Sequence, residues 1–569
     1  MNERSWHRFY DAGVPRGSAF LESLPIDRFL ERSARRDPER TALVFLNRRV
    51  TYGELKIEVD RCAAALLALG VERGCPVAVQ LVNSPQSVAA SLAVLSLGAH
   101  LVMTNPLHVG REIERHWTEA GCRVAVTLDT IYARQIAPIR DRLPVRDYLI
   151  ASIPDYLRFP ARQLAWLKLR CRRPPMVAPM PYGDGLHRFR CLVRRSPPWR
   201  PAAHVEWDDV AVLQHTGGTT GSAKCAVLTH GNLSSNVQQM AAWFPGIQPG
   251  AEVFLCILPH FHIFGLTTAM LLPLYLGATM VLEPDPRNLD RAVAALNRHR
   301  VTLFPGVPAM FTAMAEHRRL TPRSVPHLKG CFAGGAPLPL ETLQRFEQAT
   351  GARLVEGYGL TEASPVTHVN PVYGERRIGT IGVPLPGTEA RIVDMETGER
   401  ELEAGEEGEL VVRGPQIMRG YRNRPGETAA ALRNGWLHTG DLGIMDEDGY
   451  VSLVGRKKEM ILASGYNIYP DEIDEVLAQH PAVAESCTIG VPDLQRGETV
   501  KAFIVLAEGA LASREELIAF CRERMAPYKV PRLIDFRREL PKSAMLKFLR
   551  RVLRDEELAR LEAEPDKSR

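Results

Sequence analysis

Short apolar runs alternate with helix-like segments over the first part of this chain, and this alternation limits the folds open to it. Between Arg40 and Asp129, strand-like pieces such as CPVAVQLV and CRVAVTLD are separated by helix-like pieces such as SVAASLAVLSLG. Strands that alternate with helices form a mostly parallel sheet buried between helical layers. A second region with the same alternation begins at Val210 and includes the strand-like runs FLCILP, ATMVLEP and VTLFPGVP. We therefore predict an α/β fold with two sheet subdomains.

The pattern changes twice toward the C-terminus. Over residues 380–454, short strand-like runs separated by glycines, such as GELVVRG and GYVSLVG, predict an antiparallel β-rich subdomain. After Lys457 and Lys458, helix-like and strand-like segments follow one another, and Ser513–Glu516 has the form of a capping box. We predict a large N-terminal domain over residues 1–456 and a small α+β domain over residues 457–569.

The composition is that of a soluble globular protein, with 45% hydrophobic and 24% charged residues. The first residues lack the apolar core of a signal peptide, so we expect none. The longest apolar run, Leu266–Leu282, is interrupted by Pro273 and Gly277, which favours a buried helix, turn and strand over a membrane span. The 10 cysteines form no CxxC pair, so we expect reduced, mostly buried thiols and no zinc. We expect a cytoplasmic protein without a nucleic-acid partner; its oligomeric state stays open, a homodimer being one alternative.

Basic residues are concentrated in residues 151–200, where 11 Lys and Arg face only Asp155 and Asp184. Such a segment favours an acidic neighbour, either lipid head groups or a nucleotide. In residues 160–173, Leu164 and Leu167 share one helical face, while Trp166 lies among the charges. We therefore state peripheral binding to anionic lipid, at the inner membrane face, as a hypothesis beside a plain solvated loop.

A loop rich in glycine and threonine, HTGGTTGSAK, begins at His215. It is no Walker A sequence, because the Gly-Lys-Ser/Thr spacing is missing. Its backbone freedom, its hydroxyls and one cation nevertheless suit a polyphosphate, with a surface turn as the alternative. The residues concerned are Thr216, Gly217, Gly218, Thr219, Thr220, Gly221, Ser222 and Lys224.

Further polar residues stand beside glycines later in the chain. Tyr358 offers a ring for a nucleotide base, Thr361 a donor for a phosphate, and Glu362 a carboxylate for Mg²⁺. Asp441 is the residue type that binds two ribose hydroxyls, and Arg456 lies at the predicted domain boundary. The alternatives are a core tyrosine, a turn-forming aspartate and a surface arginine.

Taken in order, these segments resemble the adenylate-forming superfamily of acyl-CoA synthetases, peptide adenylation domains and luciferases. TGGTTGSAK is similar to its phosphate loop, ILPHFHIFG to its acyl-site motif, FAGGAPL to its adenine loop, and EGYGLTEASP to its Tyr-Gly-x-Thr-Glu motif. WLHTGDLG resembles its ribose aspartate, GRKKEMILASGYNIYP its hinge and CoA-side loop, and PKSAMLKFLRR its C-terminal lysine motif. Within the superfamily, SIPDYLRFPARQLAWLKL and PYGDGLHRF are similar to bacterial long-chain fatty-acid:CoA ligases.

The resemblance implies two steps with ATP, Mg²⁺ and coenzyme A. A fatty acid first forms acyl-AMP and pyrophosphate, and the CoA thiol then displaces AMP. Lys224, Thr361, Glu362, His262 and Lys547 would serve the first step, with Thr216 and Glu362 at the metal. A mobile small domain would turn about Lys458, and an apolar tunnel along 264–270 and 332–336 would hold the acyl chain. The nucleotide and CoA would also contact Gly335, Ala336, Pro337, Glu356, Gly357, Gly359, Ser464, Gly465 and Tyr466.

Two positions depart from the family pattern. Cys225 follows Lys224 where glycine is usual, and a positive φ there would cost about 1 kcal/mol. Leu546 precedes Lys547 where glycine is also usual, and leucine favours a helix running back through Met545. Two alternatives therefore stay open: a binder of acyl groups or nucleotides without catalysis, and an acyl-AMP ligase that loads an acyl carrier protein.

Overall fold

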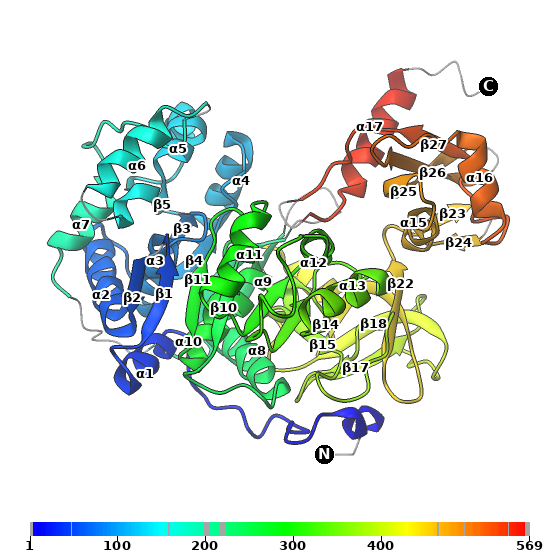
Figure 1. Ribbon diagram of the computed structural model, residues 1–569, viewed down its shortest axis with the longest axis horizontal. Helices are drawn as coiled ribbons and strands as arrows, with labels where there is room; N and C mark the ends of the chain where they lie inside the picture. The colour runs from blue at the N-terminus through cyan, green and yellow to red at the C-terminus, as the bar shows by residue number, and fades with distance from the viewer. Residues whose placement is uncertain are drawn as a thin grey trace. The chain divides into compact units, whose positions relative to one another are not determined.

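A computed structural model gives the architecture of the chain (Figure 1). It describes residues 4–46, 48–157, 160–173, 175–198, 205–216, 224–463, 466–493, 496–543 and 546–563. Two compact units divide the chain: the larger contains Met1–Thr216, Lys224–Glu389 and Arg413–Gly435, and the smaller contains Ala390–Val412 and Trp436–Arg569. Strands on both sides of residue 456 belong to the smaller unit, and the predicted boundary at that residue remains a prediction.

One sheet of the larger unit has eight strands in the order β19-β9-β8-β4-β3-β5-β6-β7. Its centre is parallel, from β8 through β7, while β9 pairs antiparallel with β8 and with β19. The strands are β3 (Pro76–Gln80), β4 (His100–Met103), β5 (Val124–Leu128), β6 (Asp147–Ala151), β7 (Leu186–Arg188), β8 (Val210–His215), β9 (Cys225–Thr229) and β19 (Gly420–Tyr421).

A second sheet has nine strands in the order β16-β15-β14-β13-β12-β10-β11-β1-β2 and is parallel from β14 to β1. Its strands are β1 (Thr41–Phe45), β2 (Arg48–Thr51), β10 (Val253–Cys256), β11 (Thr279–Leu282), β12 (Leu303–Gly306), β13 (Gly330–Ala333), β14 (Arg353–Gly359), β15 (Val366–Val369) and β16 (Val383–Pro384). The two predicted α/β subdomains are confirmed, but the strands are divided between the two sheets differently from the prediction. The early strands β1 and β2 belong to the second sheet, and β8 and β9 to the first.

Helices cover both sheets of the larger unit (Figure 1). Several begin at a side-chain cap: Thr51 accepts from the Glu54 amide, and Ser84 accepts from the Ser87 amide. The helices are α1 (Arg28–Arg36), α2 (Tyr52–Ala68), α3 (Pro85–Ser96), α4 (Gly110–Ala120), α5 (Asp129–Ile131), α6 (Ala161–Arg170), α7 (Phe189–Arg195), α8 (His230–Trp243), α9 (Ile263–Leu266), α10 (Leu272–Leu276), α11 (Leu289–Arg298), α12 (Pro308–Ala315), α13 (Leu340–Thr350) and α14 (Pro425–Ala431). Short turns of other helix types are η1 (Ser5–Phe9), η2 (Tyr132–Ile136), η3 (Ala137–Arg142), η4 (Ile153–Tyr156), η5 (Thr267–Leu271) and η6 (Thr361–Ala363). The short strand β20 (Leu432–Arg433) follows α14.

The smaller unit contains two groups of strands. In the first, β18 (Glu407–Arg413) pairs antiparallel with β21 (Trp436–Met445), which pairs antiparallel with β22 (Val451–Arg456); β17 is Glu389–Val393. In the second, β25 (Val483–Asp493) and β26 (Gly497–Leu506) form a long antiparallel pair beside β23 (Ile461–Ala463), β24 (Tyr466–Ile468) and β27 (Leu533–Phe536). Its helices are α15 (Pro470–Ala478), α16 (Arg514–Arg522) and α17 (Arg550–Ala563). The predicted antiparallel region, the α+β segment and the capping box of Ser513 with Glu516 are confirmed.

The apolar run Leu266–Leu282 folds as predicted, into helical turns, a left-handed turn at Gly277 and strand β11. No helix among the described residues is both long and apolar enough to cross a membrane. All ten cysteines are free thiols, and seven of them are buried, so the prediction of mostly buried thiols is confirmed.

Candidate functional site

The larger unit contains an apolar pocket with few polar groups in its lining, as is typical of small-molecule sites. Its wall includes Phe264 and Thr268 from the acyl-site segment and Phe332–Gly335 from the β13 loop, so the structure brings together the two stretches predicted for an acyl tunnel. Trp243, the last residue of α8, and Ile247, four residues after it, line the pocket as well. The pocket therefore extends between the loop after β14 and the end of α8.

Polar side chains are few in this pocket. His262 caps α9, with Nδ1 accepting from the Phe264 amide at 3.2 Å, and its ring lines the pocket. Tyr358 and Thr361, from β14 and η6, line it too. The structure thus places three of the predicted site residues beside one apolar cavity. Glu362 is the next residue along the chain after Thr361.

Glycines permit two close approaches at this wall. A Cβ at Gly359 would lie 2.1 Å from the Pro365 carbonyl oxygen, which no side chain tolerates. A Cβ at Gly334 would lie 3.1 Å from Phe264 Cζ and 3.3 Å from the Gly357 carbonyl oxygen. The absence of a side chain at Gly334 therefore allows the Phe264 ring and the Gly357 carbonyl to lie close to the end of β13.

The loop Gly335–Pro337 is exposed and follows β13 directly. Gly335 has a φ of +86°, a conformation that glycine adopts readily. Glu356 Oε1 accepts from the Leu338 amide at 3.1 Å, so this carboxylate fixes the loop that the sequence assigns to the nucleotide. The structure supports a positioning role for Glu356.

The predicted phosphate loop lies mostly outside the described residues, since Gly217, Gly218, Thr219, Thr220 and Gly221 fall in the gap 217–223. Its two flanks meet, because the Thr216 amide donates to the Lys224 carbonyl at 2.8 Å. Cys225 lies in strand β9, opposite His215. The strain considered for Cys225 does not arise, because an extended strand suits any side chain.

Tyr421 connects two predicted site residues. Its hydroxyl donates to Glu362 Oε1 at 2.7 Å, and the Lys224 ammonium lies 4.6 Å from the centre of its ring. Burial raises the pKa of Tyr421, and the Glu362 charge raises it further, so the phenol stays a neutral donor. No sequence signal identified Tyr421, because RGYRNRP carries no pattern that pairs it with a segment sixty residues earlier.

The residues present fit a magnesium ion that arrives with a nucleotide. Among the residues that the structure describes, no three His, Cys, Asp or Glu side chains gather to hold a metal. Mg²⁺ commonly binds one or two carboxylates together with substrate phosphates. Glu362 gives one oxygen to Tyr421 and can present the other to a cation. The Thr216 hydroxyl would be the second protein ligand.

In the smaller unit, Asp441 and Arg456 face each other across the antiparallel pair β21–β22. Arg456 Nε lies 2.9 Å from Asp441 Oδ1, and the Asp441 side chain is buried. The strand register therefore joins two residues that the sequence assigned to one nucleotide.

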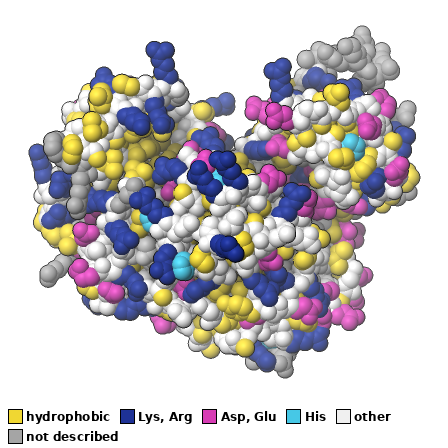
Figure 2. Space-filling model, in the orientation of Figure 1, with side chains coloured by type: hydrophobic (Ala, Val, Ile, Leu, Met, Phe, Trp, Pro, Cys, Tyr) yellow, Lys and Arg dark blue, Asp and Glu magenta, His cyan; other side chains and the backbone are white. Residues whose placement is uncertain are grey.

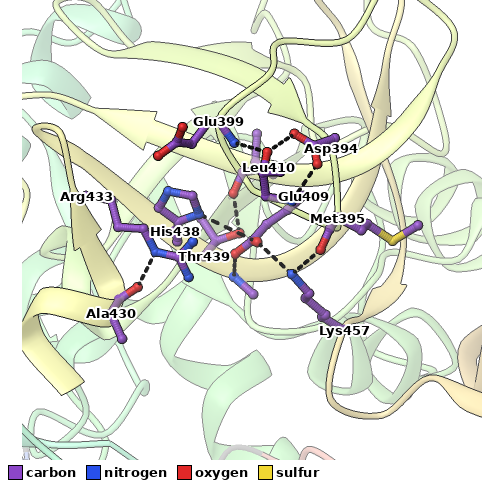
Figure 3. Close-up of polar contacts among 12 residues, drawn as sticks. Asp394, Met395, Glu399, Glu409, Leu410, Ala430, Arg433, His438, Thr439 and Lys457 are labelled. Atoms are coloured by element: carbon purple, nitrogen blue, oxygen red, sulfur yellow. Dashed lines mark hydrogen bonds and ion pairs between the residues drawn. The ribbon is translucent and has the colours of Figure 1, made fainter. Parts of the chain in front are cut away.

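Lys457 is anchored just before the predicted hinge at Lys458. Its Nζ donates to the Met395 carbonyl at 2.9 Å and lies 3.4 Å from Glu409 Oε2, toward which His438 also points (Figure 3). Lys458 itself is exposed. A fixed residue followed by an exposed one suits a pivot, because backbone rotation at Lys458 need not break the contacts of Lys457.

Lys547 ends the segment 543–547, whose two end residues are hydrogen-bonded to each other. The Ser543 amide donates to its carbonyl at 2.8 Å, and its own amide donates to Ser543 Oγ at 3.2 Å. The Arg456 charge lowers the pKa of Lys547, and Asp441 opposes that effect. The smaller unit therefore brings Lys547 into electrostatic range of both Asp441 and Arg456.

Arg550, three residues later, fixes the base of this loop. Its guanidinium contacts Glu459 at 2.9 Å, Asp471 at 2.5 Å and Asp474 at 2.6 Å. It thereby links α17 to α15 and to the residue after Lys458. The CoA-side residues Ser464 and Gly465 lie outside the described residues, and Tyr466 begins β24 opposite Ala463.

The expectation that Leu546 extends a helix is wrong. Leu546 has a φ of +60°, and α17 begins only at Arg550. A leucine in this left-handed region is strained by about 1–2 kcal/mol, whereas glycine is not.

We therefore expect Leu546→Gly to raise the rate of pyrophosphate release by up to about fivefold, because about 1 kcal/mol of loop strain is relieved. Initial rates at saturating ATP and fatty acid measure this. Leu546→Ala retains the Cβ and should match wild type. Equal rates for both variants would show that the strain does not affect this step.

Comparisons with known proteins agree with this arrangement. A family model described as AMP-binding enzyme matches residues 30–422, and one described as AMP-binding enzyme C-terminal domain matches residues 472–547. A long-chain-fatty-acid–CoA ligase of Bacillus subtilis (strain 168) is 42% identical over 559 residues, covering 98% of this chain and 99% of its own length. One of Escherichia coli O157:H7 is 37% identical over 567 residues, covering 97% and 98%.

Solved structures share the fold. ATP-bound MatB from Rhodopseudomonas palustris superposes with a TM-score of 0.82 at 28% identity, covering 96% of this chain and 100% of its own. The anthranilate CoA ligase AuaEII, in complex with anthranoyl-AMP, also gives 0.82 at 27% identity, covering 96% and 99%.

Proposed function

Because this chain belongs to the AMP-binding enzyme family, we propose that it joins long-chain fatty acids to coenzyme A in an ATP-dependent, AMP-forming reaction. The observation that carries the proposal is the apolar pocket, whose wall includes Trp243 and Thr361. Thr361 directly precedes Glu362, the carboxylate that we assign to the nucleotide site. A long hydrocarbon chain fits such a wall, since each buried methylene contributes about 0.8 kcal/mol.

In the first step, the fatty-acid carboxylate attacks the α-phosphate of ATP, and pyrophosphate leaves. Two anions must meet, so positive charge and hydrogen-bond donors are required. Lys224, Thr361 and Lys547 would supply these, and His262 would orient the carboxylate from the pocket wall. Mg²⁺ held by Glu362 and Thr216 would neutralise the phosphates.

In the second step, the CoA thiol attacks the acyl-AMP carbonyl, and AMP leaves. Lys547 then has to withdraw, and rotation about Lys458 would exchange it for the CoA-side loop around Gly465. Asp441 and Arg456 would hold the ribose and phosphate of AMP through both steps. The anchoring of Lys457 supports Lys458 as the pivot.

Pyrophosphate release tests this function directly. The purified chain is given ATP, Mg²⁺ and saturated fatty acids of increasing length, with and without CoA. We expect release to rise with chain length and acyl-CoA to form only when CoA is present. Nucleotide binding without pyrophosphate release would favour the non-catalytic alternative. Acyl transfer to an acyl carrier protein, but not to CoA, would favour the carrier-loading alternative.

Helix α6 supports contact with an anionic membrane. It has no buried residue, and Leu164 and Leu167 are 65% and 57% exposed. Exposed basic residues surround them at Lys168, Arg172 and Arg173. Figure 2 shows hydrophobic and Lys/Arg side chains together on the surface where Figure 1 places α6. Apolar residues framed by cations suit the interface of an acidic bilayer, where fatty acids also partition.

Replacing Lys168, Arg172 and Arg173 by serine should weaken binding to vesicles rich in phosphatidylglycerol about 100-fold, at about 1 kcal/mol per charge. Co-sedimentation measures the effect. The matched control replaces the exposed Arg318, Arg319 and Arg323 by serine and should bind like wild type. Wild-type sedimentation that does not depend on anionic lipid would contradict the proposal.

A further inference from the structure

The N-terminal arm, residues 4–14, lies against segments of the larger unit that are distant from it in the sequence (Figure 1). Its only regular element is η1. Arg4 pairs with Glu389 at 2.8 Å at one end of the arm. The arm is thus held by residues more than 350 positions later in the chain.

Asp11 is the main anchor of the arm. Its Oδ2 accepts from the amides of Val372 at 2.8 Å and Tyr373 at 2.9 Å, and the residue is buried. Hydrogen bonds to an ionised carboxylate are stronger than those between neutral groups. The arm is therefore fixed in one register at the segment that follows β15.

Tyr10, next to this anchor, makes two contacts with residues beyond the arm. Its ring meets Trp243 edge to face, with centroids 5.0 Å apart at 83°. Its hydroxyl donates to the Pro384 carbonyl at 2.6 Å. Such aromatic pairs stabilise by about 0.5–1.5 kcal/mol beyond area burial.

Both contacts of Tyr10 reach the wall of the apolar pocket. Trp243 lines it and is 2% exposed, with its indole N–H donating to the Asn370 carbonyl at 3.1 Å. Leu385, the residue after Pro384, lines it too. Tyr10 therefore stands directly behind the wall that Trp243 and Leu385 form.

We infer that the N-terminal arm is part of the acyl-binding site, where Tyr10 braces Trp243 and so sets the longest acyl chain that the pocket accepts. This inference rests on the proposed function, which assigns the pocket to the acyl chain. Without the Tyr10 ring, the indole gains space behind it and the pocket lengthens. Each methylene that then becomes buried changes affinity about fourfold.

The test compares the full chain with Tyr10→Ala, Tyr10→Phe, Trp243→Ala and the control Arg8→Ala, an exposed residue of the same arm. Two quantities are measured for saturated acids of 8 to about 20 carbons: the dissociation constant of the acid, and kcat/KM for pyrophosphate release. We expect Tyr10→Ala and Trp243→Ala to move the optimum by at least two carbons toward longer acids. Tyr10→Phe and Arg8→Ala should keep the wild-type optimum.

Asp11→Asn loosens the arm while the Tyr10 ring is retained, and it should move the optimum in the same direction. An unchanged optimum in Tyr10→Ala, or an equal loss at every chain length, overturns the inference, and so does an unchanged optimum in Trp243→Ala. A wild type that binds acids but releases no pyrophosphate contradicts the proposed function. In that case the dissociation constants of wild type and variants still test whether the arm sets the accepted chain length. A wild type that binds no acid contradicts both.

Discussion

Replacing Lys547 by alanine is expected to slow pyrophosphate release from ATP and a fatty acid by about 100- to 1,000-fold, the effect typical of losing one charged group at a transition state. The loop Ser543–Lys547 fixes the backbone of this lysine, and Arg550 fixes the loop to α15. The second step does not use the ammonium, so acyl-CoA formation from preformed acyl-AMP should stay within about threefold of wild type.

Rapid-quench measurements with labelled ATP, and separately with synthetic acyl-AMP and CoA, resolve the two steps. Lys542→Ala is the matched control, because Lys542 directly precedes this loop and pairs with Glu485. It should leave both steps unchanged. Equal pyrophosphate release by Lys547→Ala and wild type would remove Lys547 from the first step.

Gly334→Val is expected to shorten the range of accepted acids. A Cβ there already lies 3.1 Å from Phe264 Cζ, and the two methyl groups of valine would occupy the pocket beyond it. If about four methylenes lose their contacts, kcat/KM for a 16-carbon acid should fall about 100-fold. Octanoate should be affected much less, because its chain is shorter.

The comparison of kcat/KM for palmitate and octanoate measures this selectivity. Gly426→Val is the control for the same substitution, since a Cβ at Gly426 meets nothing within 4 Å. An equal loss for both acids in Gly334→Val would indicate general disruption of the β13 loop and would place the acyl chain elsewhere.

The order of elements and the chemistry of the motifs could be predicted because they depend on local sequence. Hydrophobic periodicity separated strands from helices over most of the chain, and Ser513 with Glu516 marked the start of α16. The motifs placed His262, Tyr358 and Thr361 in one site, and the structure lines one pocket with them. The backbone at Leu546 was not predicted, since its φ of +60° is imposed by the loop and opposes the preference of leucine.

The sequence by itself determined that this chain forms two α/β sheets, a β-rich region and a small α+β region, and it supplied the residues that we assign to a nucleotide site. Only the tertiary structure decided that β1 joins β11, that Tyr421 bridges Glu362 and Lys224, and that Tyr10 stands behind Trp243. Secondary-structure propensity acts over a few residues and can be recognised in the sequence as a periodic pattern. Contacts between distant segments arise from packing and strand register, for which a single sequence carries no periodic signal.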